Sequence, residues 1–513
     1  MITETEFERI TVCCDGLLTA SDSTPARVAI PWLHVLHGHP AQLAQYEGLF
    51  PGSADGERNG ILKSLRRAAV DVRDRARGWG NAGQPWQAND ELPTETDVLL
   101  LTHHVSGRHG GLAEDFYFGD LPWQLSAAGK KVVVAAIDHT GDETAELCAP
   151  EREGGITQVR LTRRLSSGIE KDFRRQMKKE SDRLNEPLGN RSDLEQAARR
   201  RAAREAMADG ARSALRVGQQ IGELVKRIQP RFIVVIHEGH AWERMVFCRA
   251  RTAMPGIRCI GYHHAVLFPW HHALKRNLAP EYNPDQILVA GEVSRDALRE
   301  ASGLRGLPVE VLGTIRSVAK TSVTAKGGEP VCVVVPEGIS DECVVLFEFA
   351  LACARAMPEC RFIFRTHPVL PLQSIAGQID GLQNRPANVE LSEASIEGDF
   401  QRSRWTMYRG SGAVVQAVLA GLKPFYVSRP GELNFDPLHQ AGPWRETVED
   451  VAQFAAATER DLEADEPQRQ RQCPQALEFC RRIFQPLDAG ALLRVMEAES
   501  NSEPMTGAVA SRA

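Results

Sequence analysis

The stretch WTMYRGSGAVVQAVLAGLKPFYV, residues 405–427, decides the fold class. Its two ends, residues 405–408 and 424–427, are short apolar runs of the kind that form buried strands. Between them two glycines flank Ser411, and the apolar pattern over residues 412–420 predicts a helix. A strand, a helix and a second strand in this order predict a parallel βαβ unit.

The same alternation extends along the chain on both sides of this unit. Further apolar strands are predicted at residues 97–101, 131–137, 231–236, 258–262, 286–290, 309–312, 331–335 and 361–365. Because continuous apolar strands are buried on both faces, we expect parallel sheets covered by helices. The predicted fold class is α/β, with two doubly wound, Rossmann-like lobes and a central cleft between them.

A composition change at residues 317–328, which are rich in Ser, Thr, Lys and Gly, predicts a linker between the lobes. The expected division places residues 1–316 in an N-terminal lobe, with a helical insertion at about 165–230. Residues 329–498 then form a C-terminal lobe, and residues 499–513 form a disordered tail.

The composition excludes several classes of protein. Of 513 residues, 42% are hydrophobic and 25% are charged, and the net charge of −6 gives no bulk attraction to nucleic acid. There is no secretory signal pattern and no apolar run near the roughly 20 residues that span a bilayer, so we expect a cytoplasmic location. The 11 cysteines show no CxxC pair, which favours reduced, buried thiols.

A basic stretch opens the helical insertion. It is either a solvated helix face or a contact with anionic lipid headgroups or an anionic acceptor, and its residues are Arg160, Arg163, Arg164, Lys171, Arg174, Arg175, Lys178 and Lys179. The second alternative would bring the protein to the inner membrane as a peripheral contact.

Ligands of open α/β sheets bind outside the carboxyl ends of the strands, so residues that follow a strand are the first candidates. Gly410, Ser411 and Gly412 follow one strand and open a helix, where close backbone approach and free N–H groups suit a phosphate. The alternative is that Ser411 is a plain helix cap. The run Arg365-Thr366-His367-Pro368 follows another strand, and its histidine either donates a hydrogen bond to a donor phosphate or only packs in a turn.

In the N-terminal half, HEGHAWE follows the strand at residues 231–236. Glu238 is a candidate general base for an acceptor hydroxyl, with His240 and Trp242 beside it on the acceptor side. The alternative is that Glu238 or Glu243 caps the next helix. The motif is not a metalloprotease zinc site, because position 241 is Ala where a second histidine would be needed.

Histidines also follow the strand at residues 258–262. His263 and His264 are expected to contact an acceptor or to stabilise charge, with His264 taking a catalytic part; the alternative is a structural role. A metal site is not expected there, because adjacent histidines point in different directions and no supporting ligand spacing is present. Four weaker candidates also lie at strand ends or beside the linker: Glu337 and Gly338 for the donor, Arg316 for the acceptor, and Glu432 for a ribose.

Several segments together resemble a known family. HEGHAWERMVF, IRCIGYHHAV, YNPDQILVAGE and LGTIR, with IPWLHVL near the N-terminus, resemble bacterial surface-carbohydrate biosynthesis glycosyltransferases. The resemblance extends over residues 31–437 and implies the two-lobed GT-B fold. The His-Pro pair and the serine motif also resemble those of bacterial sialyltransferases and Kdo transferases. That implies that His367, Pro368 and Ser411 bind the CMP part of a CMP-sugar, with Glu238 as the acidic base.

The expected function is transfer of a sialic-acid-like or Kdo-like ulosonic acid from a CMP-sugar to a bacterial surface glycan or a lipid-linked glycan. No metal, no cofactor and no nucleic acid are expected to take part. Two alternatives use the same fold, a UDP-sugar 2-epimerase and a glycerol-phosphate transferase. A third alternative is a non-catalytic partner in envelope polysaccharide assembly.

Overall fold

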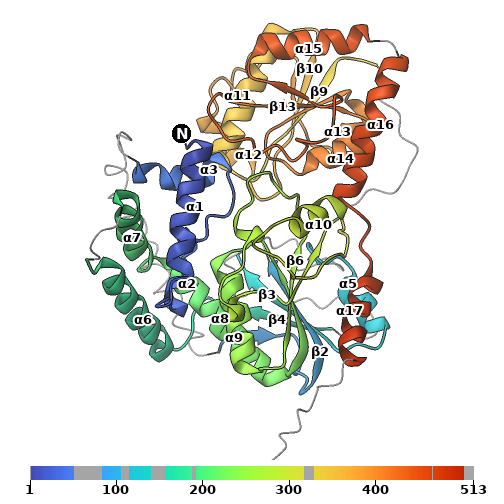
Figure 1. Cartoon of the computed structure of the whole chain (residues 1–513). Coiled ribbons are helices and arrows are strands. Elements are labelled where there is room, and N and C mark those ends of the chain that lie inside the picture. Colours follow the sequence, from blue (N-terminus) through green and yellow to red (C-terminus); the bar gives the residue numbers. More distant parts are fainter. Residues whose placement is uncertain are drawn as a thin grey trace, which may run out of the picture.

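Two parallel-sheet lobes make up the chain, one above the other in Figure 1. The computed structural model describes residues 2–50, 84–104, 115–139, 156–187, 192–316, 328–464 and 466–501. The predicted fold class, α/β with two doubly wound sheets, is confirmed by the strand orders below. Most of the predicted linker and residues 502–513 of the predicted tail lie outside the described residues.

The N-terminal sheet has the order β1-β4-β3-β2-β5-β6-β7-β8 in the described part of the chain. Every neighbouring pair is parallel except β1 and β4. The strands are β1 Trp86–Ala88, β2 Thr96–His104, β3 Val132–Asp138, β4 Thr157–Leu161, β5 Pro230–Ile236, β6 Arg258–His263, β7 Gln286–Val289 and β8 Val309–Val311. The chain winds outward from β2 in one direction and then from β5 in the other, so the strand order reverses between β2 and β5.

Helices cover both faces of this sheet, because its central strands are apolar on both sides. Helices α8 and α9 pack on one face, where Ile221 and Phe247 share an apolar cluster with Leu99 of β2. Helix α8 is capped by Gln229, whose left-handed backbone (φ 45°) turns the chain into β5. The N-terminal lobe's helices are α1 Glu4–Leu18, α2 Pro25–Val28, α3 Pro40–Leu43, α5 Leu121–Ala127, α6 Ser167–Asn185, α7 Asp193–Glu205, α8 Asp209–Ile228, α9 Ala241–Ala253 and α10 Glu292–Arg299.

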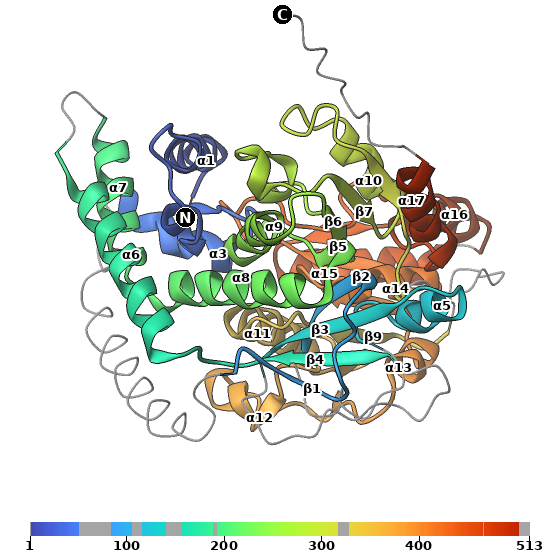
Figure 2. The ribbon, with the colours of Figure 1, turned by 90° about the horizontal axis from the view of Figure 1, so that it is seen from below.

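A side layer of helices stands beside the N-terminal sheet. Helices α1, α6 and α7 form this layer at the left of Figure 2. Its interior holds a buried ion pair in which Arg27 Nε donates to Glu180 of α6 at 2.6 Å. No helix of the described residues is long and apolar enough to span a membrane.

The C-terminal sheet has the order β11-β10-β9-β12-β13-β14 over the described residues, with all neighbours parallel. Its strands are β9 Val331–Val335, β10 Arg361–Phe364, β11 Val389–Leu391, β12 Trp405–Tyr408, β13 Lys423–Val427 and β14 Glu446–Val448. The order reverses between β9 and β12. The βαβ unit predicted from residues 405–427 is therefore confirmed as β12, α14 and β13.

The C-terminal lobe's helices also lie on both faces of their sheet. Phe347 of α11 and Phe454 of α15 pack on one face, while Val415 of α14 and Leu477 of α16 pack on the other. The helices are α11 Ser340–Ala356, α12 Leu372–Ile375, α13 Ile396–Arg402, α14 Ala413–Leu419, α15 Val451–Glu463, α16 Glu466–Ile483 and α17 Ala489–Asn501.

The last helix, α17, returns to the N-terminal lobe. Its Leu492 and Met496 lie in one apolar cluster with Leu121 of α5, and the two helices lie side by side in Figures 1 and 2. The chain crosses between the lobes twice, after β8 and between α16 and α17. These two crossings are hydrogen-bonded to each other, since Thr314 N donates to Gln485 O at 2.8 Å. The division that assigned residues up to 498 to the C-terminal lobe is corrected accordingly, because the apolar face of α17 completes the N-terminal core.

Candidate functional site

The two points of strand-order reversal carry the candidate residues. In the N-terminal sheet, β2 ends at His104 and β5 is followed by Glu238. In the C-terminal sheet, β9 is followed by Glu337 and β12 by Gly410. Ligands of doubly wound sheets bind at such reversal points, outside the carboxyl ends of the strands.

Glu238 is held in place by its neighbours. The Glu243 carboxylate accepts the backbone N–H groups of Glu238, Gly239 and His240 at 2.8–3.1 Å, and accepts His237 Nδ1–H at 2.6 Å. Gly239 has φ +91°, and a Cβ there would lie 2.6 Å from Ala273, so only glycine fits this turn. The capping role therefore belongs to Glu243, which leaves the Glu238 side chain free of it.

Glu238 and His240 form a partly exposed ion pair. His240 Nε2 lies 3.6 Å from Glu238 Oε2, and the side chains are 36% and 32% exposed. Burial alone would raise the pKa of Glu238, but the hydrogen bond and charge of His240 bring it well below 4.5. Burial would lower the pKa of His240, but Glu238 and Glu243 raise it above 6.5. Glu238 is thus ionised at neutral pH and open to solvent.

The pKa of His240 is expected to fall in Glu238→Gln, because the amide removes the negative partner. Folding raises the pKa of His240 and lowers that of Glu238. The contribution of the pair to the stability of the folded state is therefore fully present between about pH 4.5 and 6.5. This stabilisation is lost as the pH rises through the pKa of His240, or falls through that of Glu238. NMR titration of the histidine ring signals measures the change, with the His272 signal as internal control because His272 pairs with Asp15. An unchanged His240 midpoint would contradict this pairing.

Buried histidines surround the pair. The rings of His37 and His263 each lie edge-on to His271, with centroids 5.6 and 5.4 Å apart. Burial lowers the pKa of these three rings and of His264, to about 4 in His37, so all four are neutral at pH 7. His263 Nε2, His264 Nδ1 and His271 Nδ1 have no hydrogen-bond partner within the part of the chain that the structure describes.

The two histidines expected on the acceptor side differ in position. His263 is fully buried, because β6 continues through it and its Nδ1 lies 3.2 Å from the His237 carbonyl. The prediction of an acceptor contact for His263 is therefore corrected to a structural role. His264 is 7% exposed, and its ring packs edge-on against Tyr117 at 4.7 Å. Trp242 packs edge-on against His103 at 5.1 Å and is partly buried.

In the C-terminal lobe, three strand ends converge. A Cβ on Gly410 would lie 2.9 Å from Glu337 Oε2, and a Cβ on Gly338 would lie 3.0 Å from His367 Nδ1. The ends of β9, β10 and β12 therefore approach closely because two of the loops carry no side chain. Ser411 is 4% exposed, and the N-cap of α14 is Gly412, so the alternative that Ser411 is a plain helix cap is excluded.

The lobes meet at this place. A Cβ added to Gly412 would lie 3.2 Å from Val266 Cγ2 and 3.9 Å from a terminal nitrogen of Arg316. Both residues belong to the N-terminal lobe. Burial lowers the pKa of His367, and the charge of Arg316 lowers it further. Burial also lowers the pKa of Arg316, which the charge of Glu238 in turn acts to raise. Glu238 and His367, predicted to face each other from separate lobes, therefore share Arg316 as an electrostatic neighbour.

A residue that the sequence did not single out, His39, also connects the lobes. Its Nε2 lies 3.0 Å from Glu337 Oε2, and its ring packs against Phe435 with centroids 4.6 Å apart. The signal was present in the sequence, because HGHP at residues 37–40 contains the same His-Pro pair as residues 367–368.

His39, Glu337 and Glu342 are the described residues that could hold a metal ion, with ligand atoms within 4.8 Å of one another. However, His39 Nδ1 accepts the Ala41 N–H at 3.2 Å, so Nε2 carries the ring proton and donates it to Glu337. The Glu342 carboxylate already accepts Arg409 Nε–H at 2.6 Å. A metal at this position would require both arrangements to break.

Two predicted donor residues have structural partners instead. Glu432 accepts Arg409 at 2.7 Å, and both side chains are at most 5% exposed. Arg365 pairs with buried Asp399 and donates to Ser392 Oγ at 3.1 Å, so it points toward β11 and α13. Both predictions are corrected, because these side chains neutralise buried charges. Pro368 is exposed beside His367.

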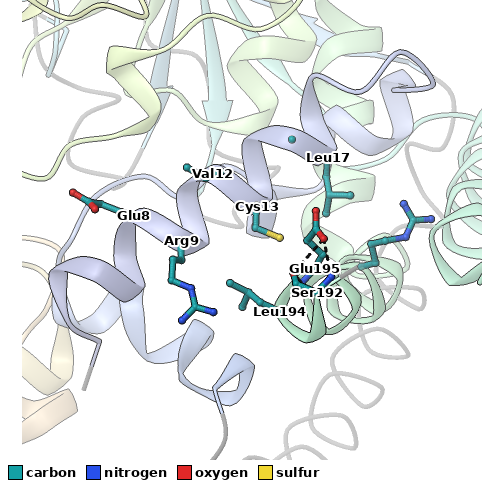
Figure 3. Close-up of a pocket in the computed structure, with 10 residues that line it drawn as sticks. Glu8, Arg9, Val12, Cys13, Leu17, Ser192, Leu194 and Glu195 are labelled. Carbon is teal, nitrogen blue, oxygen red and sulfur yellow. Dashed lines mark hydrogen bonds between the residues drawn. The ribbon is translucent and has the colours of Figure 1, made fainter. Parts of the chain in front are cut away.

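A cavity of about 690 Å³ lies elsewhere, between α1 and α7 (Figure 3). Arg9, Val12 and Cys13 of α1 line it, together with Leu194 of α7. None of the residues predicted from the sequence lines this cavity, so it is separate from the strand-end site.

No protein-family model matches the chain, and no curated protein matches it in sequence. Among solved structures, it is similar to α,α-trehalose 6-phosphate synthase from Burkholderia multivorans, with 13% identity over 79% of this chain and 97% of that chain, and a TM-score of 0.47. It is also similar to the glycosyltransferase SnogD from Streptomyces nogalater, with 14% identity over 78% and 100% of the two chains, and a TM-score of 0.44. At these identities the similarity concerns the fold and assigns no activity.

Proposed function

We propose that the chain is a glycosyltransferase that takes a sugar from a nucleotide-sugar donor. The observation that carries this proposal is the meeting of the two reversal points, with ionised Glu238 on one side and His367 beside Gly338 on the other. The donor binds at the ends of β9, β10 and β12. The acceptor hydroxyl approaches Glu238 from the N-terminal lobe.

In the proposed reaction, Glu238 accepts the proton of the acceptor hydroxyl as its oxygen attacks the anomeric carbon. The bond from that carbon to the donor phosphate breaks, and the phosphate leaves with the electron pair. His367 and Ser411 donate hydrogen bonds to the departing phosphate, and preorganised donors of this kind supply a large share of such rate enhancements. Neutral His264 adds a ring N–H near the reacting groups.

The finer proposal is that the donor is a CMP-sugar carrying a sialic-acid-like or Kdo-like ulosonic acid. It is supported by the His367-Pro368 pair and the serine motif at Ser411. The acceptor would be a bacterial surface glycan, free or lipid-linked, and the exposed basic side chains of α6 would favour contact with the inner membrane. These side chains are Lys171, Arg174, Arg175, Lys178 and Lys179.

The test is a thermal-shift panel of CMP, UDP, GDP and dTDP. CMP at about 100 times its Kd is expected to stabilise the wild type by about 2.7 kcal/mol. In His367→Ala the same CMP concentration should give a smaller shift, because a hydrogen bond to a charged group is worth about 1.5–3 kcal/mol. The control is His272→Ala, which removes a histidine paired with Asp15.

Each outcome of the panel decides between candidates. A response to UDP alone would overturn the CMP donor and favour a UDP-sugar enzyme such as a 2-epimerase. No response to any nucleotide, together with no turnover, would favour a non-catalytic partner in envelope assembly. A CMP response equal in His367→Ala and wild type would remove His367 from the donor site.

A further inference from the structure

Arg316 is anchored where the two lobes meet. Its backbone N–H donates to Thr314 Oγ1 at 3.3 Å, and its carbonyl accepts Gln416 Nε2–H from α14 at 3.4 Å. The backbone N–H of Thr314 in turn donates to the carbonyl of Gln485, which lies between α16 and α17. The backbone of Arg316 is therefore tied to the C-terminal lobe, although it follows the last strand of the N-terminal sheet.

The guanidinium of Arg316 has no directly paired carboxylate among the described residues. By contrast, buried Arg27, Arg404 and Arg409 each bind a carboxylate, and buried Arg244 donates to Asn283 Oδ1 and the Ala273 carbonyl. Burial lowers the pKa of Arg316, and the charge of Glu238 only partly offsets this. A partly buried cation without a paired anion is costly, which points to a ligand that supplies the negative charge.

The surroundings of the guanidinium suit an anionic oxygen group. Gly412 has no side chain on that side, and a Cβ there would lie only 3.9 Å from Arg316. The charge of Arg316 also acts on His367, whose ring lies against Gly338. A guanidinium matches phosphate or carboxylate oxygens with two parallel hydrogen bonds.

We propose that Arg316 binds an anionic group of the donor, a phosphate of the nucleotide or the carboxylate of an ulosonic acid, jointly with His367. Arg316 thus belongs to the donor site and not to the acceptor side, where the sequence had placed it. This inference rests on the proposed function for the identity of the ligand. For the site it rests on a guanidinium that no carboxylate in the described part of the chain pairs with. The donor is then held by both lobes at once.

The test is calorimetric titration of the full chain with CMP, UDP, inorganic pyrophosphate, a free ulosonic acid, cytidine and uridine. Arg316→Gln is expected to weaken the binding of CMP, or of whichever nucleotide binds, by about 10- to 100-fold. This is the range for the loss of a hydrogen bond to a charged group. Binding of the matching nucleoside, which has no phosphate, should not change. Arg316→Lys should lose less nucleotide affinity than Arg316→Gln. The lysine variant replaces the glutamine variant in the test if the latter fails to fold. The control is Arg299→Gln, whose side chain pairs with Glu310 on the exposed surface.

The outcomes separate this inference from the proposed function. Equal nucleotide affinity in Arg316→Gln and wild type overturns the contact between Arg316 and a phosphate. If free ulosonic acid then binds the wild type more tightly than it binds Arg316→Gln, the group that Arg316 binds is the carboxylate. If the acid also binds both equally, the inference fails while the proposed function stands. If the wild type binds pyrophosphate but no nucleotide, and Arg316→Gln loses it, the anion site stands and the proposed function fails. Binding of none of these anions overturns both.

Discussion

Glu238→Gln is expected to lower kcat by about 10²- to 10⁴-fold while leaving donor affinity unchanged, the range for loss of a general base. Glutamine keeps the shape of the side chain but cannot accept a proton. Because the pKa of Glu238 lies well below 4.5, the ionised base persists to acidic pH. The acid limb of kcat/KM in the wild type should therefore lie below pH 4.5, and it should disappear in the variant.

The measurement is steady-state kinetics of sugar transfer, with donor affinity followed separately by titration. Glu281→Gln is the control, because Glu281 is an exposed carboxylate in the same lobe. Wild-type turnover in Glu238→Gln would exclude Glu238 as the base. Loss of donor affinity with unchanged kcat would instead assign Glu238 to ground-state binding.

Arg409→Met is expected to destabilise the C-terminal lobe by about 3–5 kcal/mol, the usual cost of leaving buried charges unpaired. Arg409 is 1% exposed and binds Glu342 at 2.6 Å, Glu432 at 2.7 Å and the Val427 carbonyl at 2.9 Å. Methionine fills much of the same volume but leaves buried Glu342 without its cation and leaves buried Glu432 with only Arg429, at 3.3 Å.

Hydrogen exchange of the peptides that contain β9 and β12 measures this loss within the lobe. The control is Arg361→Met, because Arg361 is 52% exposed and pairs with Glu390 on the surface, where such pairs contribute at most about 1 kcal/mol. Equal protection in Arg409→Met and the control would show that Glu342 and Glu432 find other partners or become protonated.

The fold was predictable because its strands are buried on both faces. Runs such as residues 231–236 and 331–335 are continuous apolar segments, and the helices between them give the parallel connection. The return of α17 was not predictable. The apolar pattern of α17 would be the same whichever of the two sheets it covered. The residues that it packs against, Leu121 among them, lie far away in the chain.

The candidate site was predictable only where position along a strand decides it. Glu238, His367 and Gly410 follow strands, and the structure brings the last two beside Gly338 and Glu337. Arg365 and Glu432 also follow strands, yet each neutralises a buried charge, and no local pattern distinguishes a paired polar side chain from a free one. His39 was missed because it precedes any strand and reaches its partner across the lobe boundary.

The return of α17 also fixes an order of events during synthesis. Leu492 and Met496 complete the apolar cluster over Val98 and Leu121, although translation makes those residues hundreds of codons earlier. The half of the molecule that leaves the ribosome first is therefore the last to close its interior. Until then the face of its sheet that α5 shares with α17 stays only partly covered, so nascent chains that stop before residue 489 should be clients for holding chaperones.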